Sequence, residues 1–173
     1  MDFEIMLPVL IALILVVVVM LTTRRYRKSH SSDYDEMQMM NRDKGYKVGF
    51  FTILIMLGVE IFASEIIGLK LMDVAMMLFI PLMTGVTIYA CYSIVKGAFF
   101  AINDKGISYT VMIGVIALCN IATGVIRVVN GSVVKNGVIT FDGAEALVMG
   151  IGFLIIAITS LIMLMKNRKE TES

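Results

Sequence analysis

The chain has 173 residues, of which 58% are hydrophobic and only 17% are charged, and its formal net charge is +1. Helices of a soluble globule need polar faces, but residues 9–21 contain no polar side chain, so the sequence argues against a soluble fold. Five apolar stretches account for most of the chain, at roughly residues 5–22, 46–68, 71–94, 107–128 and 145–165. Each is about long enough to span ~30 Å of hydrocarbon as a helix, which predicts an all-α polytopic membrane protein with five transmembrane helices.

Residues 1–22 are predicted to form an amino-terminal transmembrane anchor. A signal peptide needs positive charge ahead of its apolar run, but Asp2 and Glu4 make this leader acidic, and the basic cluster 24–28 follows the run instead. The four consecutive valines at 16–19 offer neither small-residue notches nor hydrogen-bonding groups for helix packing. We therefore expect an uncleaved helix that faces lipid over much of its surface.

Residues 23–45 are predicted to form a cytoplasmic linker that contains a short amphipathic helix from about Asp33 to Lys44. Asp33 followed by Glu36 suits a helix start, and Arg42 and Lys44 suit a helix end. The apolar edge of this helix would lie on the bilayer surface or against the other helices. A solvated linker helix without a partner is an equally open alternative.

Residues 46–165 are predicted to form a four-helix transmembrane bundle of two hairpins, and residues 166–173 a cytoplasmic tail. The loop inside the first hairpin is short, at roughly residues 68–72, so its two helices should be antiparallel neighbours. The loop inside the second hairpin contains the pairs Asn130-Gly131 and Asn136-Gly137 beside two runs rich in β-branched residues, which predicts a small exposed β-hairpin. Small and hydroxyl-bearing side chains in the third and fifth stretches are expected to mediate helix packing. They are Thr84, Thr87, Cys91, Gly150, Gly152, Thr159 and Ser160.

The basic residues predict the orientation, because Lys and Arg that flank a span are retained on the cytoplasmic side. Twelve of the 15 fall in the first loop, around the third loop or after the last span. The other three, Lys70, Arg127 and Lys135, lie on the opposite side. The expected topology places the amino terminus outside and the carboxyl terminus in the cytoplasm.

Four polar side chains within the apolar stretches make up a candidate intramembrane site, because burying such groups in hydrocarbon is costly. Glu60 lies about two turns inside the outer end of the second stretch, whereas Asn120, Thr123 and Arg127 form one stripe at helical spacing in the fourth. We expect Glu60 to meet Arg127 or Asn120 at a similar depth. Two interpretations remain open: a site for a proton, cation or cationic ligand, or an internal salt bridge that specifies helix packing.

Residues 34–38 followed by 44–52, and later residues 97–104, resemble the cytoplasmic segments of small uncharacterised multi-span membrane proteins of Firmicutes. The first family segment tends to read Asp-Glu-Arg-Gln, so Met37 departs from it. The resemblance carries no assigned activity and implies a bacterial plasma membrane. It also draws attention to a candidate cytoplasmic cluster, which would either join the loops or bind a ligand. Its members are Asp35, Glu36, Lys44, Tyr46, Lys47, Asn103 and Asp104.

The sequence contains no cofactor box, catalytic triad or metal-ligand cluster, so we expect no enzyme activity, no cofactor and no bound metal. The first function hypothesis is a non-enzymatic accessory, regulatory or immunity-type protein that acts by binding another membrane protein. The alternative is a small transporter or channel subunit that uses Glu60, Asn120 and Arg127. The expected partners are the lipid bilayer and either another membrane protein or a second copy of the chain, but not nucleic acid.

Overall fold

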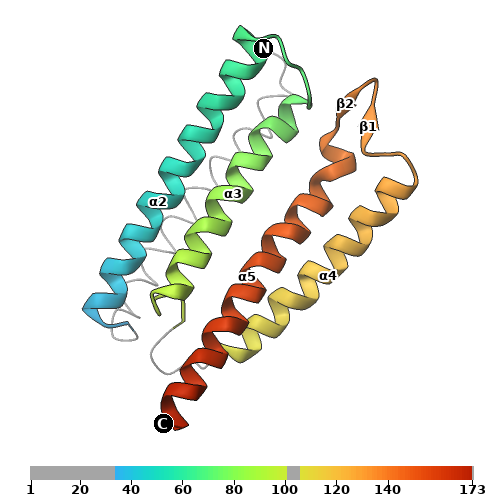
Figure 1. The fold of residues 1–173 in the computed structure, drawn as a ribbon. Helices are drawn as coiled ribbons and strands as arrows, with labels where there is room; N and C mark the ends of the chain where they lie inside the picture. The colour runs from blue at the N-terminus through green and yellow to red at the C-terminus, as the bar shows by residue number, and fades with distance from the viewer. Residues whose placement is uncertain (1–33, 101–105, 173) are drawn as a thin grey trace, which may run out of the picture. The chain divides into compact units, whose positions relative to one another are not determined.

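Four helices long and apolar enough to cross a membrane dominate the computed structural model, which describes residues 34–100 and 106–172 (Figure 1). The predicted anchor at residues 1–22 lies outside the described residues. The elements are α2 (Glu36–Ile61), the π-helix η1 (Phe62–Ile66), α3 (Val74–Val95), α4 (Ile107–Val129), the strands β1 (Val134–Lys135) and β2 (Val138–Ile139), and α5 (Phe141–Glu172). The predicted class, a helical chain with several apolar spans, is confirmed for this part of the sequence.

Helix α2 is longer than the sequence predicts, because it runs through the expected boundary at residue 45 without a break. Gly45 lies inside the helix and is buried. A Cβ atom on Gly45 would lie 3.0 Å from the Ser93 hydroxyl and 3.2 Å from the Tyr89 ring, so this glycine allows α3 to approach closely. The separate linker helix expected up to residue 44 is therefore wrong, and likewise α5 continues through most of the predicted tail to Glu172.

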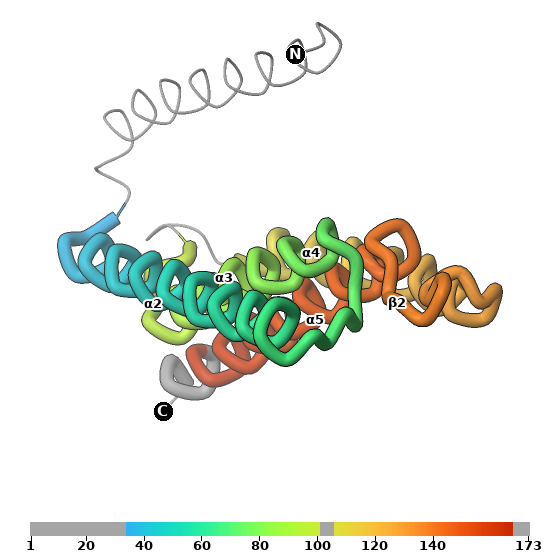
Figure 2. Tube along the Cα trace, turned by 90° about the horizontal axis from the view of Figure 1, so that it is seen from above, coloured from blue at the N-terminus to red at the C-terminus, as the bar shows by residue number. Residues whose placement is uncertain are grey.

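The four helices form an open row in the order α2, α3, α5, α4 (Figure 1). Helix α2 packs on α3, α3 on α5, and α5 on α4, whereas any contact between the outer helices α2 and α4 is marginal. The helices run alongside one another in the view from above as well (Figure 2). The two predicted hairpins are confirmed, but they do not close into a bundle. In lipid, helices gain no hydrophobic free energy by closing a ring, so an open row is a stable arrangement.

Two glycines bring α2 and α3 into backbone contact. A Cβ atom on Gly49 would lie 2.9 Å from the Gly85 carbonyl oxygen, and one on Gly85 would lie 2.3 Å from Cγ1 of Ile53. Such close approach strengthens dispersion contacts along the helix pair, which is the main source of association between helices in lipid. The α2–α3 hairpin therefore depends on the absence of side chains at these two positions.

Hydroxyl groups and glycines fill the contacts that α5 makes with α3 and α4, as the sequence predicts. The Thr110 hydroxyl lies 2.5 Å from the Ser160 hydroxyl, and both residues are buried. The Cys91 sulfur lies 3.4 Å from the Thr159 hydroxyl. A Cβ atom on Gly152 would meet the Thr87 hydroxyl at 2.9 Å, so this glycine also permits close packing. These contacts surround an apolar core of Ala90, Ile94 and Ile156.

The predicted β-hairpin between α4 and α5 is confirmed. Strands β1 and β2 pair antiparallel, and the two residues between them, Asn136 and Gly137, have φ angles of 54° and 77°. Two consecutive residues with positive φ are the pattern of a type I′ turn, which Asn-Gly favours. Ile139 of β2 also pairs with Met72 in the loop before α3, so this hairpin links the two helix pairs.

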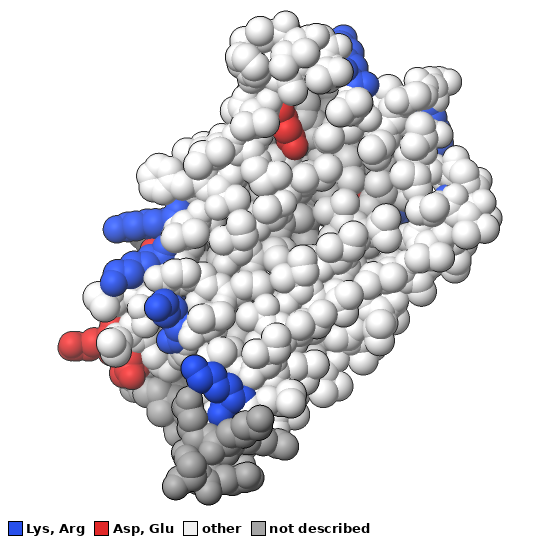
Figure 3. Space-filling model, viewed as in Figure 1, with Lys and Arg blue, Asp and Glu red and all other residues white. Residues whose placement is uncertain are grey.

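The two ends of the row differ in charge. We call the end where α2 joins α3 and α4 joins α5 the loop end, and the opposite end, where α2 begins and α3 and α5 finish, the basic end. Lys and Arg side chains gather toward the basic end on the face drawn in Figure 3. They include Arg42, Lys44, Lys47, Lys96 and Lys166.

Candidate functional site

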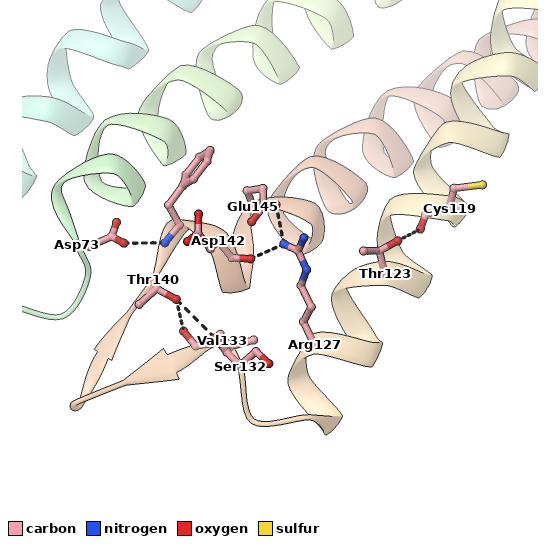
Figure 4. A network of polar contacts seen from close by, with 10 residues as sticks. Asp73, Cys119, Thr123, Arg127, Ser132, Val133, Thr140, Asp142 and Glu145 are labelled. Carbon is pink, nitrogen blue, oxygen red and sulfur yellow. Dashed lines mark hydrogen bonds and ion pairs between the residues drawn. The ribbon is translucent and has the colours of Figure 1, made fainter. Parts of the chain in front are cut away.

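Asp73 connects the two hairpins at the loop end (Figure 4). Its Oδ1 accepts a hydrogen bond of 2.7 Å from the Met76 N–H, which caps α3, and its Oδ2 accepts one of 2.8 Å from the Phe141 N–H at the start of α5. Its own N–H donates to the Ile139 carbonyl oxygen at 2.9 Å. The first N–H groups of a helix have no partner inside that helix. One carboxylate thus caps two helices from different hairpins.

These hydrogen bonds hold the pKa of Asp73 below its ordinary value of 3.8, the bond from the Phe141 N–H having the larger effect and that from the Met76 N–H the smaller. A carboxylate with a lowered pKa stabilises the fold fully above its unfolded pKa and loses that contribution as the pH falls through the folded value. We therefore expect the stabilising effect of Asp73 to be complete above about pH 4 and to disappear on further acidification.

Replacing Asp73 with Ala is expected to lower the midpoint of thermal unfolding by roughly 5 °C at neutral pH, because two helix starts lose their cap. The measurement is thermal unfolding of the protein in nanodiscs at neutral and acidic pH. Asp142→Ala is the matched control, because the Asp142 side chain is exposed and only its backbone carbonyl is bonded to Arg127. Equal shifts for the two variants would contradict the double cap.

Arg127 joins the last turn of α4 to the first turns of α5. Its Nη1 nitrogen lies 2.5 Å from Oε1 of Glu145 and also donates to the Asp142 carbonyl oxygen (Figure 4). The side chains of Arg127 and Glu145 are 33% and 23% exposed, so the pair is partly shielded from solvent. A cation at a helix carboxyl end and an anion at a helix amino end each also interact favourably with the helix dipole. The pair therefore fixes the α4–α5 hairpin at its loop end.

The four residues of the predicted intramembrane site do not come together. Arg127 pairs with Glu145 rather than with Glu60. Asn120 and Thr123 donate to carbonyl oxygens of their own helix, at 2.9 and 3.0 Å. The expected meeting of Glu60 with Arg127 or Asn120 is not formed because α3 and α5 lie between α2 and α4 in the row.

Glu60 occupies a different environment, on the stripe of α2 that faces α3. This stripe contains the buried Gly45 and Gly49, and the partly buried Ile53, Met56 and Glu60 continue it at helical spacing. The Glu60 Oε2 atom is buried and has no hydrogen-bond partner among the described residues. The π-helix η1 begins two residues later, at Phe62. A buried carboxylate oxygen without a donor is costly, and π-helical turns occur frequently at functional sites.

At the basic end, a different group of side chains joins α2 to α3. The Gln38 amide nitrogen donates to the Gly97 carbonyl oxygen at 2.7 Å. The ring of Tyr46 stacks on that of Tyr89, with centroids 4.3 Å apart and planes 14° apart. Arg42 also interacts with Tyr89. These contacts hold the first turns of α2 against the last turns of α3.

Of the seven residues in the predicted cytoplasmic cluster, Tyr46 takes part in the contacts just described. Tyr46 takes part through its stacking on Tyr89, whereas Glu36, Lys44 and Lys47 are exposed. Asp35 is exposed as well. The remaining two members, Asn103 and Asp104, lie outside the described residues.

Sequence reasoning missed the residues that make the strongest polar contacts. Asp73 immediately precedes an apolar run, which is the pattern of a helix N-cap, so this signal was present in the sequence. Glu145 and Arg127 carry opposite charges at the facing ends of one predicted hairpin, which is a weaker signal. Nothing in the sequence around Gln38 indicates that its side chain bonds to Gly97 rather than facing solvent.

A scan against protein-family models finds no match to this chain, and searches of curated proteins and of solved structures find none either. The class of protein is therefore argued from the helices alone. Four of them have the length and composition of membrane spans, and they are joined as two hairpins with a polar tie at the loop end. This is the arrangement of a helical membrane protein.

Proposed function

We propose that this chain is a non-enzymatic accessory, regulatory or immunity-type membrane protein that acts by binding another membrane protein. The observation that carries the proposal is the open row, in which α2 and α4 each pack on one neighbour only. Large apolar side chains cover their free sides. Ile55 and Val59 of α2 are 66% and 63% exposed, and Leu118 and Ile126 of α4 are 63% and 60% exposed. Both outer helices thus present long faces on which a further helix would pack.

The polar groups of the described residues support this proposal, because most of them have structural roles. Asp73 caps two helices, and Arg127 is neutralised by Glu145. Thr110 and Ser160 bond to each other inside the helix contacts. Such groups position helices and leave little polar surface for chemistry on a substrate.

For the location, we propose a bacterial plasma membrane, with the basic end in the cytoplasm. The distribution of Lys and Arg supports this orientation, because positive residues that flank spans are retained on the cytoplasmic side. The resemblance of residues 34–38, 44–52 and 97–104 to small membrane proteins of Firmicutes supports the bacterial origin. In this orientation the carboxyl terminus is cytoplasmic and the predicted first span places the amino terminus outside.

Native mass spectrometry of the tagged protein, extracted gently from its own membrane, tests the proposed function. We expect a complex of defined mass that contains a different polypeptide together with this chain. A lone monomer, or an assembly of copies of this chain alone, under conditions that preserve a known complex from the same membrane would contradict the proposal.

A second candidate function is a small transporter or channel subunit, and one observation favours it. The Glu60 Oε2 atom is buried without a hydrogen-bond partner among the described residues, beside the π-helix η1. Because Asn120 and Arg127 are bonded elsewhere, the polar site of this alternative would be centred on Glu60 and on a neighbour such as Ser64. A proton or a cation would satisfy the unpaired oxygen.

Replacing Glu60 with Gln separates the two candidates. For an accessory protein we expect equal or higher folded yield and unchanged partner binding, because a neutral amide costs less to bury than a carboxylate without a donor. Proton or cation flux is measured in proteoliposomes for both forms. Flux in the natural protein that is lost in the Gln variant would favour transport, and Glu65→Gln, at an exposed residue of the same region, is the control.

A further inference from the structure

We infer that the face of α4 that carries Asn120 binds the same helix of a second copy of this chain. The inference goes beyond the proposed function, because it adds a contact between two copies of this chain to the contact with another membrane protein. Three residues on one flank of α4 define this face, which we call the Asn120 flank: Ile116, Asn120 and Thr123. It lies at the end of the helix row, where α5 is the helix on which α4 packs extensively among the described residues.

The spacing on the Asn120 flank suits a helix pair. The three residues are separated by four and then three positions, which is the spacing of the contact positions in left-handed pairs of helices. Ile116 is 39% exposed, and Thr123 is exposed as well. The neighbouring face of the same helix is occupied already, because Ala117 is buried and Gly124 packs on Leu147 of α5. The exposed side chains of Ile116 and Thr123 are therefore available to a second helix beside the α4–α5 contact.

The chemistry of Asn120 indicates what that second helix must offer. Its Nδ2 donates to the Ile116 carbonyl oxygen at 2.9 Å, and the structure gives its Oδ1 no donor among the described residues. Asn120 lies near the middle of the 23-residue helix, at a depth where lipid supplies no hydrogen bonds. The side-chain amide of Asn120 still has one acceptor oxygen and one N–H to pair, and another amide can bond to both of them. The partner helix therefore needs a polar side chain at the same depth.

A second copy meets this requirement through its own Asn120. Copies of one chain insert in the membrane with the same orientation, so a two-fold axis along the membrane normal places identical residues at identical depth. Asn120 would then face Asn120 of the second copy, and each amide would both donate and accept. The apolar segment 5–21 of this chain cannot supply such a group, because it contains no side chain with an N–H or O–H donor.

The test uses two differently tagged copies expressed together in the native membrane. One tag is captured, and the amount of the other that is recovered with it is measured. We expect recovery from the natural chain, a roughly tenfold loss with Asn120→Leu, and retention with Asn120→Gln, which keeps an amide. Thr52→Val is the control, because the Thr52 hydroxyl on the other outer helix likewise donates to a carbonyl four residues earlier, that of Val48.

The possible outcomes separate this inference from the proposed function. Thermal unfolding of each variant shows whether a loss of recovery reflects loss of the fold. Equal recovery for Asn120→Leu and the natural chain would overturn the Asn120 contact. Capture of a different membrane polypeptide with no second copy would overturn the inference and leave the proposed function intact, whereas capture of neither would contradict both.

Discussion

Replacing Gly49 with Ala is expected to destabilise the protein by about 2 kcal/mol, although alanine ordinarily favours a helix over glycine by about 1 kcal/mol. The reason is steric. The new Cβ atom would lie 2.9 Å from the Gly85 carbonyl oxygen and 3.1 Å from Cβ of Tyr89. A backbone oxygen cannot move aside as a flexible side chain can, so α2 and α3 would have to separate along their contact.

The matched control lies on the same helix. A Cβ atom on Gly58 would meet no other atom within 4 Å, so Gly58→Ala should be neutral or stabilising. The same comparison is available on α4, where Gly124 is packed against the Leu147 backbone and Gly114 faces open space. The free energy of unfolding is measured by detergent titration for all four variants. The same sign of change for Gly49→Ala and Gly58→Ala would contradict the close α2–α3 contact.

Replacing Arg127 with Ala is expected to cost roughly 2 to 3 kcal/mol, close to the range for breaking a partly buried ion pair. The substitution leaves the Glu145 carboxylate without its cation, and the second oxygen of that carboxylate, Oε2, is already buried without a hydrogen-bond partner among the described residues. The Asp142 carbonyl oxygen loses its donor as well. The α4–α5 hairpin should then open at its loop end.

A double-mutant cycle isolates the pair. We expect Arg127→Ala combined with Glu145→Ala to cost clearly less than the sum of the single variants, because the double variant leaves no unpaired charge. Arg127→Ala combined with Glu60→Ala should be additive, since Arg127 is paired with Glu145 in the structure. Coupling of Arg127 to Glu60 instead of Glu145 would contradict the order of the helices in the row.

The predictions from the sequence succeeded where local pattern decides the structure. Apolar runs of sufficient length became α3 and α4, and the Asn136–Gly137 pair became the turn of a β-hairpin. The small and hydroxyl residues of α5, such as Gly150 and Ser160, became helix contacts, because small residues let helices approach closely and hydroxyl groups bond between helices inside a membrane. In each case the structure is determined by a pattern of residues that are close together in the sequence.

The predictions failed where the result depends on which helices are neighbours. Hydropathy gives the depth of Glu60 and Arg127 but not the two helices that lie between them, so depth alone suggested a pair that the row excludes. A helix end was expected at Lys44, ahead of Gly45, because Arg42 and Lys44 suit the carboxyl end of a helix. In the structure the missing side chain of Gly45 instead admits Tyr89, a contact that only the packed hairpin reveals.

Photo-crosslinking from the free faces of the outer helices tests the central claim most directly. A photoreactive residue is placed in turn at Ile55 and Val59 of α2 and at Ile116 and Leu118 of α4, all of which are exposed. After illumination of intact cells, we expect a protein adduct of defined mass from at least one of the two helices. Adducts with lipid alone at all four positions would contradict a function carried out through a membrane partner.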